Sequence, residues 1–218
     1  MKSSSHVVLV TGFTPFGGEA INPSWQIAAA LPTHIGGATI KRLEVPTEFH
    51  RAIKVVTREI DQLKPSIVLC LGQAGGSTAL TLERVAINID DAALADNAGV
   101  QPIDQAIVKG GKAAYFATLP IKAMAAAIQH KNIPASISNS AGTFVCNHLI
   151  YGVLHHIEKK KYAIRAGFMH VPYLPAQVVT QAGQPSMSLR DMCMGVEVAI
   201  EAALTTKTDK KLLGGSLD

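Results

Sequence analysis

The stretch from Val7 to Leu31, VVLVTGFTPFGGEAINPSWQIAAAL, joins a short apolar segment to a helix through a glycine-rich loop. Residues 7–11 are apolar and rich in β-branched side chains, which predicts a buried strand. Residues 12–18 contain too much glycine and proline for a helix and predict a loop. Asn22 and Pro23 predict the start of a helix, with Asn22 as its N-cap and Pro23 at its first position.

The same alternation continues along the chain. Strands are expected at residues 39–45, 66–71, 84–89, 115–119, 135–138 and 163–171, and helices at 48–63, 120–130, 144–160 and 187–204. Alternating strands and helices predict a single-domain, three-layer α/β/α sandwich around a mostly parallel twisted sheet. No linker divides residues 1–218, and the polar tail 205–218 is expected to fray. The active site of such a sheet lies outside the carboxyl ends of its strands.

The composition favours a folded protein of the cytoplasm. The chain is 48% hydrophobic and 17% charged, which is typical of a folded domain and favours an oligomer over a monomer. The net charge of +4 is scattered, so neither nucleic acid nor membrane is expected as a partner. The apolar run 7–10 is too short for the core of a signal peptide. Three cysteines are too few, and odd in number, for a disulfide framework, which indicates a reducing compartment.

Cys146 is the strongest candidate for a nucleophile. It follows a small polar turn and lies in the first turn of the helix expected at residues 144–160. Unpaired N–H groups and the helix dipole stabilise a thiolate at such a position. The competing interpretation is a buried thiol that packs as a small hydrophobe, and this interpretation fits Cys70 and Cys193 better.

A cysteine nucleophile needs a base and a group that orients the base. Among eight histidines, His170 is favoured because it ends a strand at the carboxyl edge. His148 points away from Cys146 because residues two apart diverge on a helix, and a metal site from His148 and His155 lacks a third ligand. The sequence pattern leaves the orienting carboxylate open, with four candidates: Glu83, Asp90, Asp91 and Asp96.

Two glycine-rich loops, at residues 12–18 and 72–76, raise the question of phosphate binding. Neither matches the P-loop or the dinucleotide fingerprint. Phe13 and Phe16 make the first loop aromatic, which suits a small apolar ring better than a phosphate. The alternative is that both phenylalanines fill the core. A phosphorylase-like enzyme therefore rests on fold analogy alone.

Six motifs in order give the chain a specific resemblance. They are VTGFTPFG at 10–17, GQAGG at 72–76, ERVAIN at 83–88, DN at 96–97 with QPID at 101–104, SAGTFVCN at 140–147 and GFMHVPY at 167–173. Together they extend from the first expected strand to the end of the last one. With these motifs, the chain resembles the pyroglutamyl peptidase I family, also called pyrrolidone-carboxylate peptidases.

The resemblance implies a single cysteine-peptidase domain that removes N-terminal pyroglutamate from peptides. It implies a Glu–Cys–His triad at Glu83, Cys146 and His170, a thioester intermediate, a homotetramer, and no metal or organic cofactor. It also implies a pocket for the pyroglutamyl ring, formed by Phe13, Phe16, Gln73, Phe144 and Val145, with Asn22 nearby.

Two positions depart from the family pattern. Ser77 and Ala93 stand where the family commonly has arginines, and the arginine at the second position is thought to assist the oxyanion. Loss of one oxyanion donor typically costs about 2.7–4 kcal/mol. The sequence therefore predicts either a weakened peptidase, with Arg84 as a candidate substitute, or a homologue that binds pyroglutamyl or lactam ligands without turnover.

Overall fold

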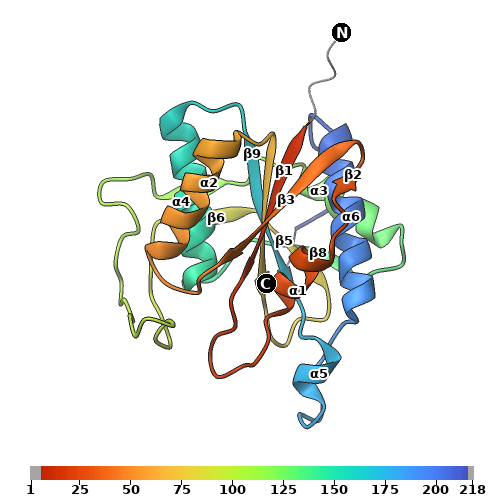
Figure 1. Cartoon of the computed structure of the whole chain (residues 1–218), viewed down its shortest axis with the longest axis horizontal. Coiled ribbons are helices and arrows are strands. Elements are labelled where there is room, and N and C mark those ends of the chain that lie inside the picture. Colours follow the sequence, from red (N-terminus) through yellow and green to blue (C-terminus); the bar gives the residue numbers. More distant parts are fainter. Residues whose placement is uncertain (1–5, 216–218) are drawn as a thin grey trace.

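The computed structural model describes residues 6–215, and seven strands form one twisted sheet at its centre (Figure 1). In the order of the sheet these are β2 (His34–Ile35), β3 (Ala38–Val45), β1 (Val7–Phe13), β4 (Ile67–Gln73), β9 (Arg165–Val171), β5 (Leu80–Glu83) and β8 (Ala135–Ser138). The four strands β3, β1, β4 and β9 are parallel neighbours, whereas β2 and β5 run antiparallel to β3 and β9. The mostly parallel sheet is confirmed.

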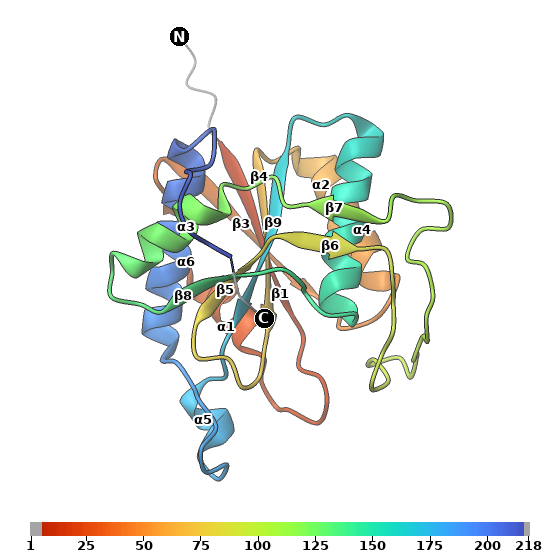
Figure 2. The same cartoon turned by 180° about the vertical axis from the view of Figure 1, so that it is seen from behind.

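Helices cover both faces of the sheet, as Figures 1 and 2 show from opposite sides. One face carries α1 (Pro23–Ala30), α3 (Ile121–Gln129) and α6 (Leu189–Thr205), and the other carries α2 (Arg51–Leu63) and α4 (Val145–Lys160). Each face has its own apolar core cluster. A further helix, α5 (Pro175–Val178), lies beyond the carboxyl ends of the strands (Figure 1). The α/β/α sandwich predicted from the sequence is therefore correct.

The junction of β1 and α1 has the predicted local structure. The Asn22 side chain accepts a hydrogen bond from the Ser24 N–H at 3.1 Å, and Pro23 opens the helix. Gly12 is required where β1 passes α1, because a Cβ there would lie 2.4 Å from the Ser24 carbonyl oxygen. The close approach brings the loop between β1 and α1 to the carboxyl edge of the sheet.

The strand predicted at residues 84–89 is confirmed only for its middle part, and a second, unpredicted strand precedes it. The chain instead forms β5, which ends at Glu83, and then β6 (Val85–Ile87), which pairs with β7 (Ala114–Phe116) in a separate two-stranded sheet. The chain passes from one sheet to the other at Arg84. The backbone N–H of Arg84 donates to the Ser138 carbonyl of β8, and its carbonyl accepts from the Ala117 N–H beyond β7. Glu83 therefore lies at the end of a strand of the main sheet, between β9 and β8, and not at the start of a strand.

Other boundaries differ where tertiary contacts intervene. The helix expected from residue 48 begins at Arg51, because the N–H of Phe49 bonds to the Asp96 carboxylate and His50 has a φ of 59°. The short elements β2 and α5 have no counterpart among the predicted elements. Along residues 206–215 the tail is irregular, but Asp209 accepts from two N–H groups at the start of α3. Residues 216–218, which are also expected to fray, lie outside the described residues.

None of the helices in residues 6–215 combines the length and apolarity that a membrane crossing requires.

Candidate active site

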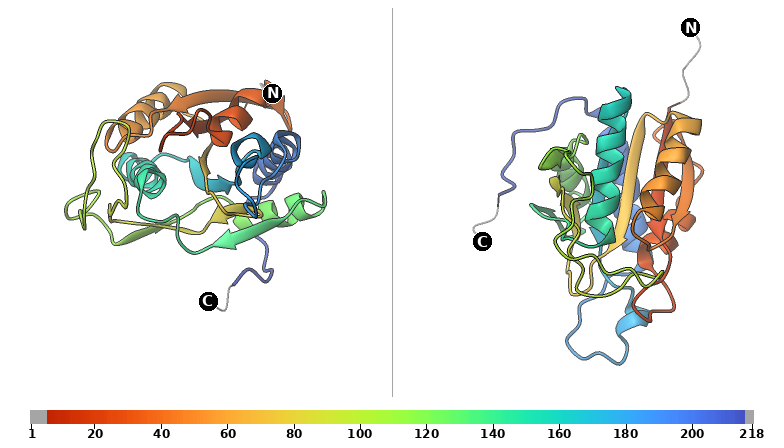
Figure 3. Two further views of the ribbon diagram at one scale, coloured as in Figure 1. Left: turned by 90° about the horizontal axis from the view of Figure 1, so that it is seen from below. Right: turned by 90° about the vertical axis from the view of Figure 1, so that its left-hand side faces the viewer.

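The carboxyl ends of the parallel strands β4 and β9 meet the start of α4 at one edge of the sheet, and the antiparallel β5 lies beside β9 there. Gly72 of β4 lies in register with His170 of β9, and Glu83 of the antiparallel β5 lies opposite Phe168 of β9. Figure 3 (left) looks onto this edge from below, with helices on both sides of the sheet. This is the location that the rule for open α/β sheets predicts.

Glu83 and His170 form a buried pair. Glu83 Oε1 lies 2.7 Å from His170 Nδ1, and the two residues are only 3% and 8% exposed. The carboxylate accepts, so the proton of a neutral imidazole sits on Nδ1 and Nε2 is left to act as a base. The other oxygen, Glu83 Oε2, is buried without a hydrogen-bond partner. The negative charge of the Glu83 carboxylate is balanced most directly by a protonated His170.

Cys146 completes the group from the first turn of α4. Burial lowers the pKa of His170, but hydrogen bonding and charge interaction with Cys146 and Glu83 outweigh burial and raise that pKa to about 10. An imidazole with a raised pKa holds its positive charge at neutral pH and stabilises a thiolate beside it. The positive charge of His170 therefore lies beside Cys146.

The start of α4 provides electrostatic support for negative charge. Its N-cap, Phe144, makes no side-chain hydrogen bond to the first turn. The N–H groups around Cys146 thus remain available at the positive end of the helix dipole. They can donate to a thiolate or to an oxyanion that forms beside it.

Three hydrogen-bonded contacts fix the start of α4 to the end of β6 and to the loop that follows it. The Asn147 amide bonds to the backbone of Ile87 on both its donor and acceptor sides, at 2.9 Å each. Thr143 bonds to the backbone of Asp91 just before the helix. His148 Nδ1 bonds to Asp90 at 2.8 Å. The position of Cys146 is therefore set by residues on either side of it.

Gly72 leaves the space that the thiol occupies. A Cβ at this position would lie 2.9 Å from Cys146 Sγ and 2.5 Å from the ring of Phe168. Both distances are shorter than van der Waals contact. Glycine is thus required here for close approach rather than for backbone conformation.

Gly72→Ala is expected to reduce the peptidase activity proposed below by about 10²-fold, because displacing a reacting atom by about 1 Å has an effect of that size. Overpacking should also lower the free energy of unfolding by about 1–3 kcal/mol. Steady-state kinetics and thermal unfolding measure the two effects. Gly215→Ala is the control, since a Cβ there meets nothing within 4 Å; equal activity of both variants would contradict this account.

The remaining titratable candidates have other partners. Asp90 binds His148 Nδ1, and His148 Nε2 accepts from the His50 N–H at 2.7 Å, so both ring nitrogens of this buried histidine have partners. Asp96 accepts from the backbone N–H groups of residues 49, 98 and 100. His155 bonds to the Tyr115 hydroxyl. Of the four carboxylates left open by the sequence, Glu83 is the one hydrogen-bonded to His170.

An aromatic cluster lies beside Cys146. Phe16 and Phe144 are half-buried with ring centroids 6.0 Å apart, and Phe49 packs edge-on to Phe144 at 5.4 Å. Phe13 is 2% exposed and contacts Phe168, so it lies in the core beneath the site. Phe49 is absent from the pocket expected from the sequence, because the pattern assigns it to a helix. Its aromatic character after the Pro46-Thr47 break is the available signal.

The other expected pocket residues have distinct surroundings. Val145 is fully buried in the core below the first turn of α4. Asn22 is 2% exposed and donates to the Thr14 carbonyl, so it holds the loop that carries Phe16. Gln73 ends β4 and accepts a hydrogen bond from Gln177 of α5. Gln177 is not identified by any pattern in the sequence.

Neither Ser77 nor Ala93, the two positions at which the resemblance implies arginines, provides a cationic side chain. Ser77 bonds to the Ala79 carbonyl, and Ala93 is exposed on the long loop. Arg84, the candidate substitute, follows Glu83 in an extended segment and donates to the Gly214 carbonyl of the tail. Its guanidinium is therefore bound to the tail.

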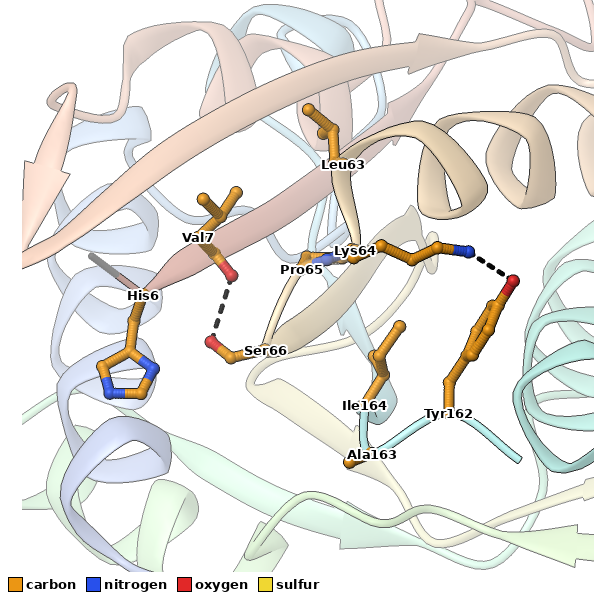
Figure 4. Close-up of a pocket in the computed structure, with 9 residues that line it drawn as sticks. All are labelled: His6, Val7, Leu63, Lys64, Pro65, Ser66, Tyr162, Ala163 and Ile164. Atoms are coloured by element: carbon orange, nitrogen blue, oxygen red, sulfur yellow. Dashed lines mark hydrogen bonds between the residues drawn. The ribbon is translucent and has the colours of Figure 1, made fainter. Parts of the chain in front are cut away.

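The cavity in Figure 4 lies away from this site. Its volume is about 440 Å³, and it is lined by residues near the starts of β1, β4 and β9, at the opposite edge of the sheet: His6, Val7, Leu63, Lys64, Pro65, Ser66, Tyr162, Ala163 and Ile164. It contains none of Glu83, Cys146 and His170. Within residues 6–215, no three His, Cys, Asp or Glu side chains form a cluster that could hold a metal ion.

Comparison with known proteins gives consistent matches over nearly the whole chain. The family model described as pyroglutamyl peptidase matches residues 6–206. The pyrrolidone-carboxylate peptidase of Bacillus cereus (strain G9842) is 50% identical over 210 residues, covering 96% of this chain and 98% of that protein. The protein of the same name from Clostridium perfringens (strain 13 / Type A) is also 50% identical over 210 residues, with 96% and 99% covered.

Solved structures show the same fold. Pyroglutamyl peptidase I from Bacillus amyloliquefaciens has a TM-score of 0.93 at 42% identity, covering 95% of this chain and 99% of that chain. The pyrrolidone carboxyl peptidase from Thermococcus litoralis has a TM-score of 0.91 at 39% identity, with 95% and 99% covered.

These matches and the α/β fold define the chain as a cysteine-type exopeptidase, a class of hydrolase. The chain belongs to the pyroglutamyl peptidase family.

Proposed function

We propose that the protein removes N-terminal pyroglutamyl residues from peptides, as a cysteine omega-peptidase with the triad Glu83, Cys146 and His170. The observation that carries this proposal is the buried 2.7 Å bond between Glu83 and His170, with Cys146 at the start of α4 contributing to the raised pKa of His170. This is the nucleophile–base–orienter geometry that acyl transfer requires.

In the proposed mechanism, the Cys146 thiolate attacks the pyroglutamyl carbonyl. The oxyanion is stabilised by N–H groups of the first turn of α4. His170, as imidazolium, gives its proton to the leaving amine, and the C–N bond breaks to leave a thioester on Cys146. His170 then accepts a proton from water, which hydrolyses the thioester and releases pyroglutamate. Glu83 keeps the imidazole in its orientation throughout.

The proposed specificity follows from the chemistry of the lactam. Pyroglutamate has a small, flat, uncharged ring, which the faces of Phe16 and Phe144 can cover, with Phe13, Val145 and Asn22 supporting the pocket walls. Gln73 can bond to a polar atom of the ring. A free N-terminal amine would lose its hydration without gaining a partner in such a pocket, so ordinary peptides should be rejected.

The substrate panel that tests this proposal comprises 7-amido-4-methylcoumarin derivatives of pyroglutamate, proline, alanine and glutamine. We expect hydrolysis of the pyroglutamyl compound with a kcat/KM at least about 10³-fold above the others, since a site that bonds a substrate group strongly rejects analogues that lack it. Hydrolysis of all four at similar rates would contradict the proposal. Binding of 2-pyrrolidone without any turnover would support the alternative, a lactam-binding homologue.

Ala93→Arg is expected to raise kcat by up to about 10²-fold if an oxyanion cation is the missing component, with little change in KM, because the added charge acts in the transition state. The motivation is the absence of a cationic side chain at positions 77 and 93. Ala93→Gln, of similar reach but uncharged, is the control. An equal effect of both substitutions would show that charge is not the cause.

We further propose a cytoplasmic homotetramer that acts on peptides without a metal or organic cofactor, and without nucleic acid or membrane as a partner. Support for association comes from apolar side chains exposed on the long loop between β6 and β7, with Leu94 at 44%, Val100 at 43% and Ile103 at 68%. Sedimentation velocity measures the assembly, and a monomer at micromolar concentration would contradict the proposal.

A further inference from the structure

A buried histidine outside the triad links the start of α4 to two other segments. His148 is fully buried and lies two residues after Cys146 in α4. Its Nδ1 lies 2.8 Å from Asp90 Oδ2, and its Nε2 lies 2.7 Å from the backbone nitrogen of His50. Because Asp90 follows β6 and His50 precedes α2, the imidazole connects three segments that are far apart in sequence.

The backbone donor of His50 fixes the protonation of this imidazole. A backbone N–H can only donate, so His148 Nε2 must present its lone pair. The single proton of a neutral imidazole is then on Nδ1, from which it is donated to the Asp90 carboxylate. Asp90 is 2% exposed, and its backbone N–H and carbonyl both bond to Gln105, so this acceptor is itself held in place. His148 is thus oriented to accept from the turn before α2.

The bond from His50 supports an unusual turn. His50 has a φ of 59°, which is rare for residues other than glycine, and its side chain does not cap α2. The bond to His148 holds the peptide that joins Phe49 to His50, and the Phe49 N–H bonds to the Asp96 carboxylate at 2.7 Å. The backbone on both sides of the Phe49 side chain is therefore held by buried polar groups.

The Phe49 ring packs against the start of α4. It lies edge-on to Phe144, with centroids 5.4 Å apart, and edge-on to His148, with centroids 5.3 Å apart. Phe144 and His148 are four residues apart, so they share one side of the helix start. Phe49 is 5% exposed, whereas Phe144 is half-buried and its ring centroid lies 6.0 Å from that of Phe16. Phe49 therefore supports Phe144, the ring that the proposed function assigns to the pyroglutamyl pocket.

We infer that His148 is a positioning residue for the substrate ring. By accepting from the His50 N–H it keeps Phe49 packed against Phe144, so that Phe144 stays fixed as one wall of the pocket. A fixed wall favours binding, because a mobile wall would lose conformational freedom each time the substrate binds. This inference rests on the proposed function, which places the pyroglutamyl ring against Phe144, and it predicts an effect on KM rather than on kcat.

The test separates the two hydrogen bonds of His148. In His148→Gln the amide can reach the position of Nε2 and accept from the His50 N–H. In His148→Asn the amide lies near the position of Nδ1, so it can donate to Asp90 but does not reach His50. Both variants lose the imidazole ring, so each is the packing control for the other. His155→Asn is the control for replacing a histidine of α4 elsewhere, because His155 bonds to the Tyr115 hydroxyl.

The expected order of effects distinguishes the bond to His50 from the bond to Asp90. With pyroglutamyl 7-amido-4-methylcoumarin, His148→Asn should raise KM by about 10-fold and change kcat by less than about threefold, the size expected for one lost buried hydrogen bond. His148→Gln should raise KM by less than about threefold, and His155→Asn should leave it unchanged. If His148 acted only through Asp90, the order would be the opposite, because asparagine keeps that bond. A KM for His148→Gln equal to or above that for His148→Asn would overturn the inference.

Phe49→Leu keeps the test decisive if the His148 variants do not fold. Leucine retains a buried apolar side chain but not the edge-on ring, so KM should rise by about 10-fold, as in His148→Asn. Adding His148→Asn to Phe49→Leu should change KM by less than about twofold, because both substitutions release the same wall. A wild-type KM in Phe49→Leu, or effects that multiply in the double variant, would overturn the inference. Wild-type enzyme without pyroglutamyl hydrolysis would refute the proposed function itself, whereas active wild type with an unchanged KM in these variants would refute this inference alone.

Discussion

Cys146→Ala is expected to lower kcat on a pyroglutamyl amide by at least about 10⁴-fold while the fold is retained. Removal of the nucleophile leaves only binding and oxyanion stabilisation, and variants of this kind in hydrolases with triads lose activity on this scale. Stability should change little, because Cys146 is half-exposed and alanine suits a helix. Steady-state kinetics with a coumarin substrate and circular dichroism provide the two readouts.

Cys193→Ala is the matched control for this substitution. Cys193 lies in α6, and burial raises the pKa of its thiol to about 11, so it carries little thiolate at neutral pH. Its replacement should leave kcat within about twofold. Activity of Cys146→Ala within tenfold of wild type would reject Cys146 as the nucleophile.

Glu83→Gln is expected to lower kcat by about 10²- to 10⁴-fold with a small change in KM. The substitution keeps the size and one hydrogen bond of the side chain, but it removes the charge that stabilises the imidazolium and permits the wrong tautomer of His170. The pKa of His170 should then fall, because Glu83 contributes to raising it. The pH profile of kcat/KM, measured beside wild type, reports both effects.

Asp61→Asn is the control for Glu83→Gln, because it also replaces a carboxylate that bonds to a histidine, but at a position away from the active site. Asp61 bonds to His156 on the helix face between α2 and α4, so the substitution removes one carboxylate from one histidine outside the site. Activity should remain within about twofold of wild type. Equal losses in Glu83→Gln and Asp61→Asn would mean that Glu83 acts through general stability and not through His170.

Local sequence signals are sufficient for much of the fold. Asn22 and Pro23 predict the start of α1 because capping and a fixed φ are local effects. The short strand predicted at residues 135–138 has the same bounds in the structure, where it is β8. The strand at 80–83 escapes prediction, because four residues after a glycine-rich loop carry little periodicity. Its existence depends on antiparallel pairing with β9, nearly 90 residues away, as the 87-residue separation of Glu83 and His170 illustrates.

The site shows the same division between local and long-range information. The helix start at Cys146 and the strand end at His170 are local features, and both can be predicted from the pattern. The pattern alone cannot choose among the carboxylates, because the bond from Glu83 to His170 depends on the register of β5 against β9. Phe49 and Gln177 escape prediction because their relevance arises only when distant loops pack together.

The most direct test of Cys146 as the activated nucleophile is alkylation of the wild-type protein by iodoacetamide as a function of pH, with peptide mapping of all three cysteines. Because the pKa of His170 is raised to about 10, its positive charge persists beside Cys146 from about pH 6 to 9, and we expect Cys146 to be alkylated fastest of the three cysteines across this range. Burial raises the pKa of Cys70 to about 12, so Cys70 should stay unmodified.

We expect activity to be lost in proportion to modification of Cys146, at a rate that is reduced by 2-pyrrolidone. Complete modification of Cys146 with activity retained, or loss of activity with Cys146 unmodified, would contradict its role as the nucleophile.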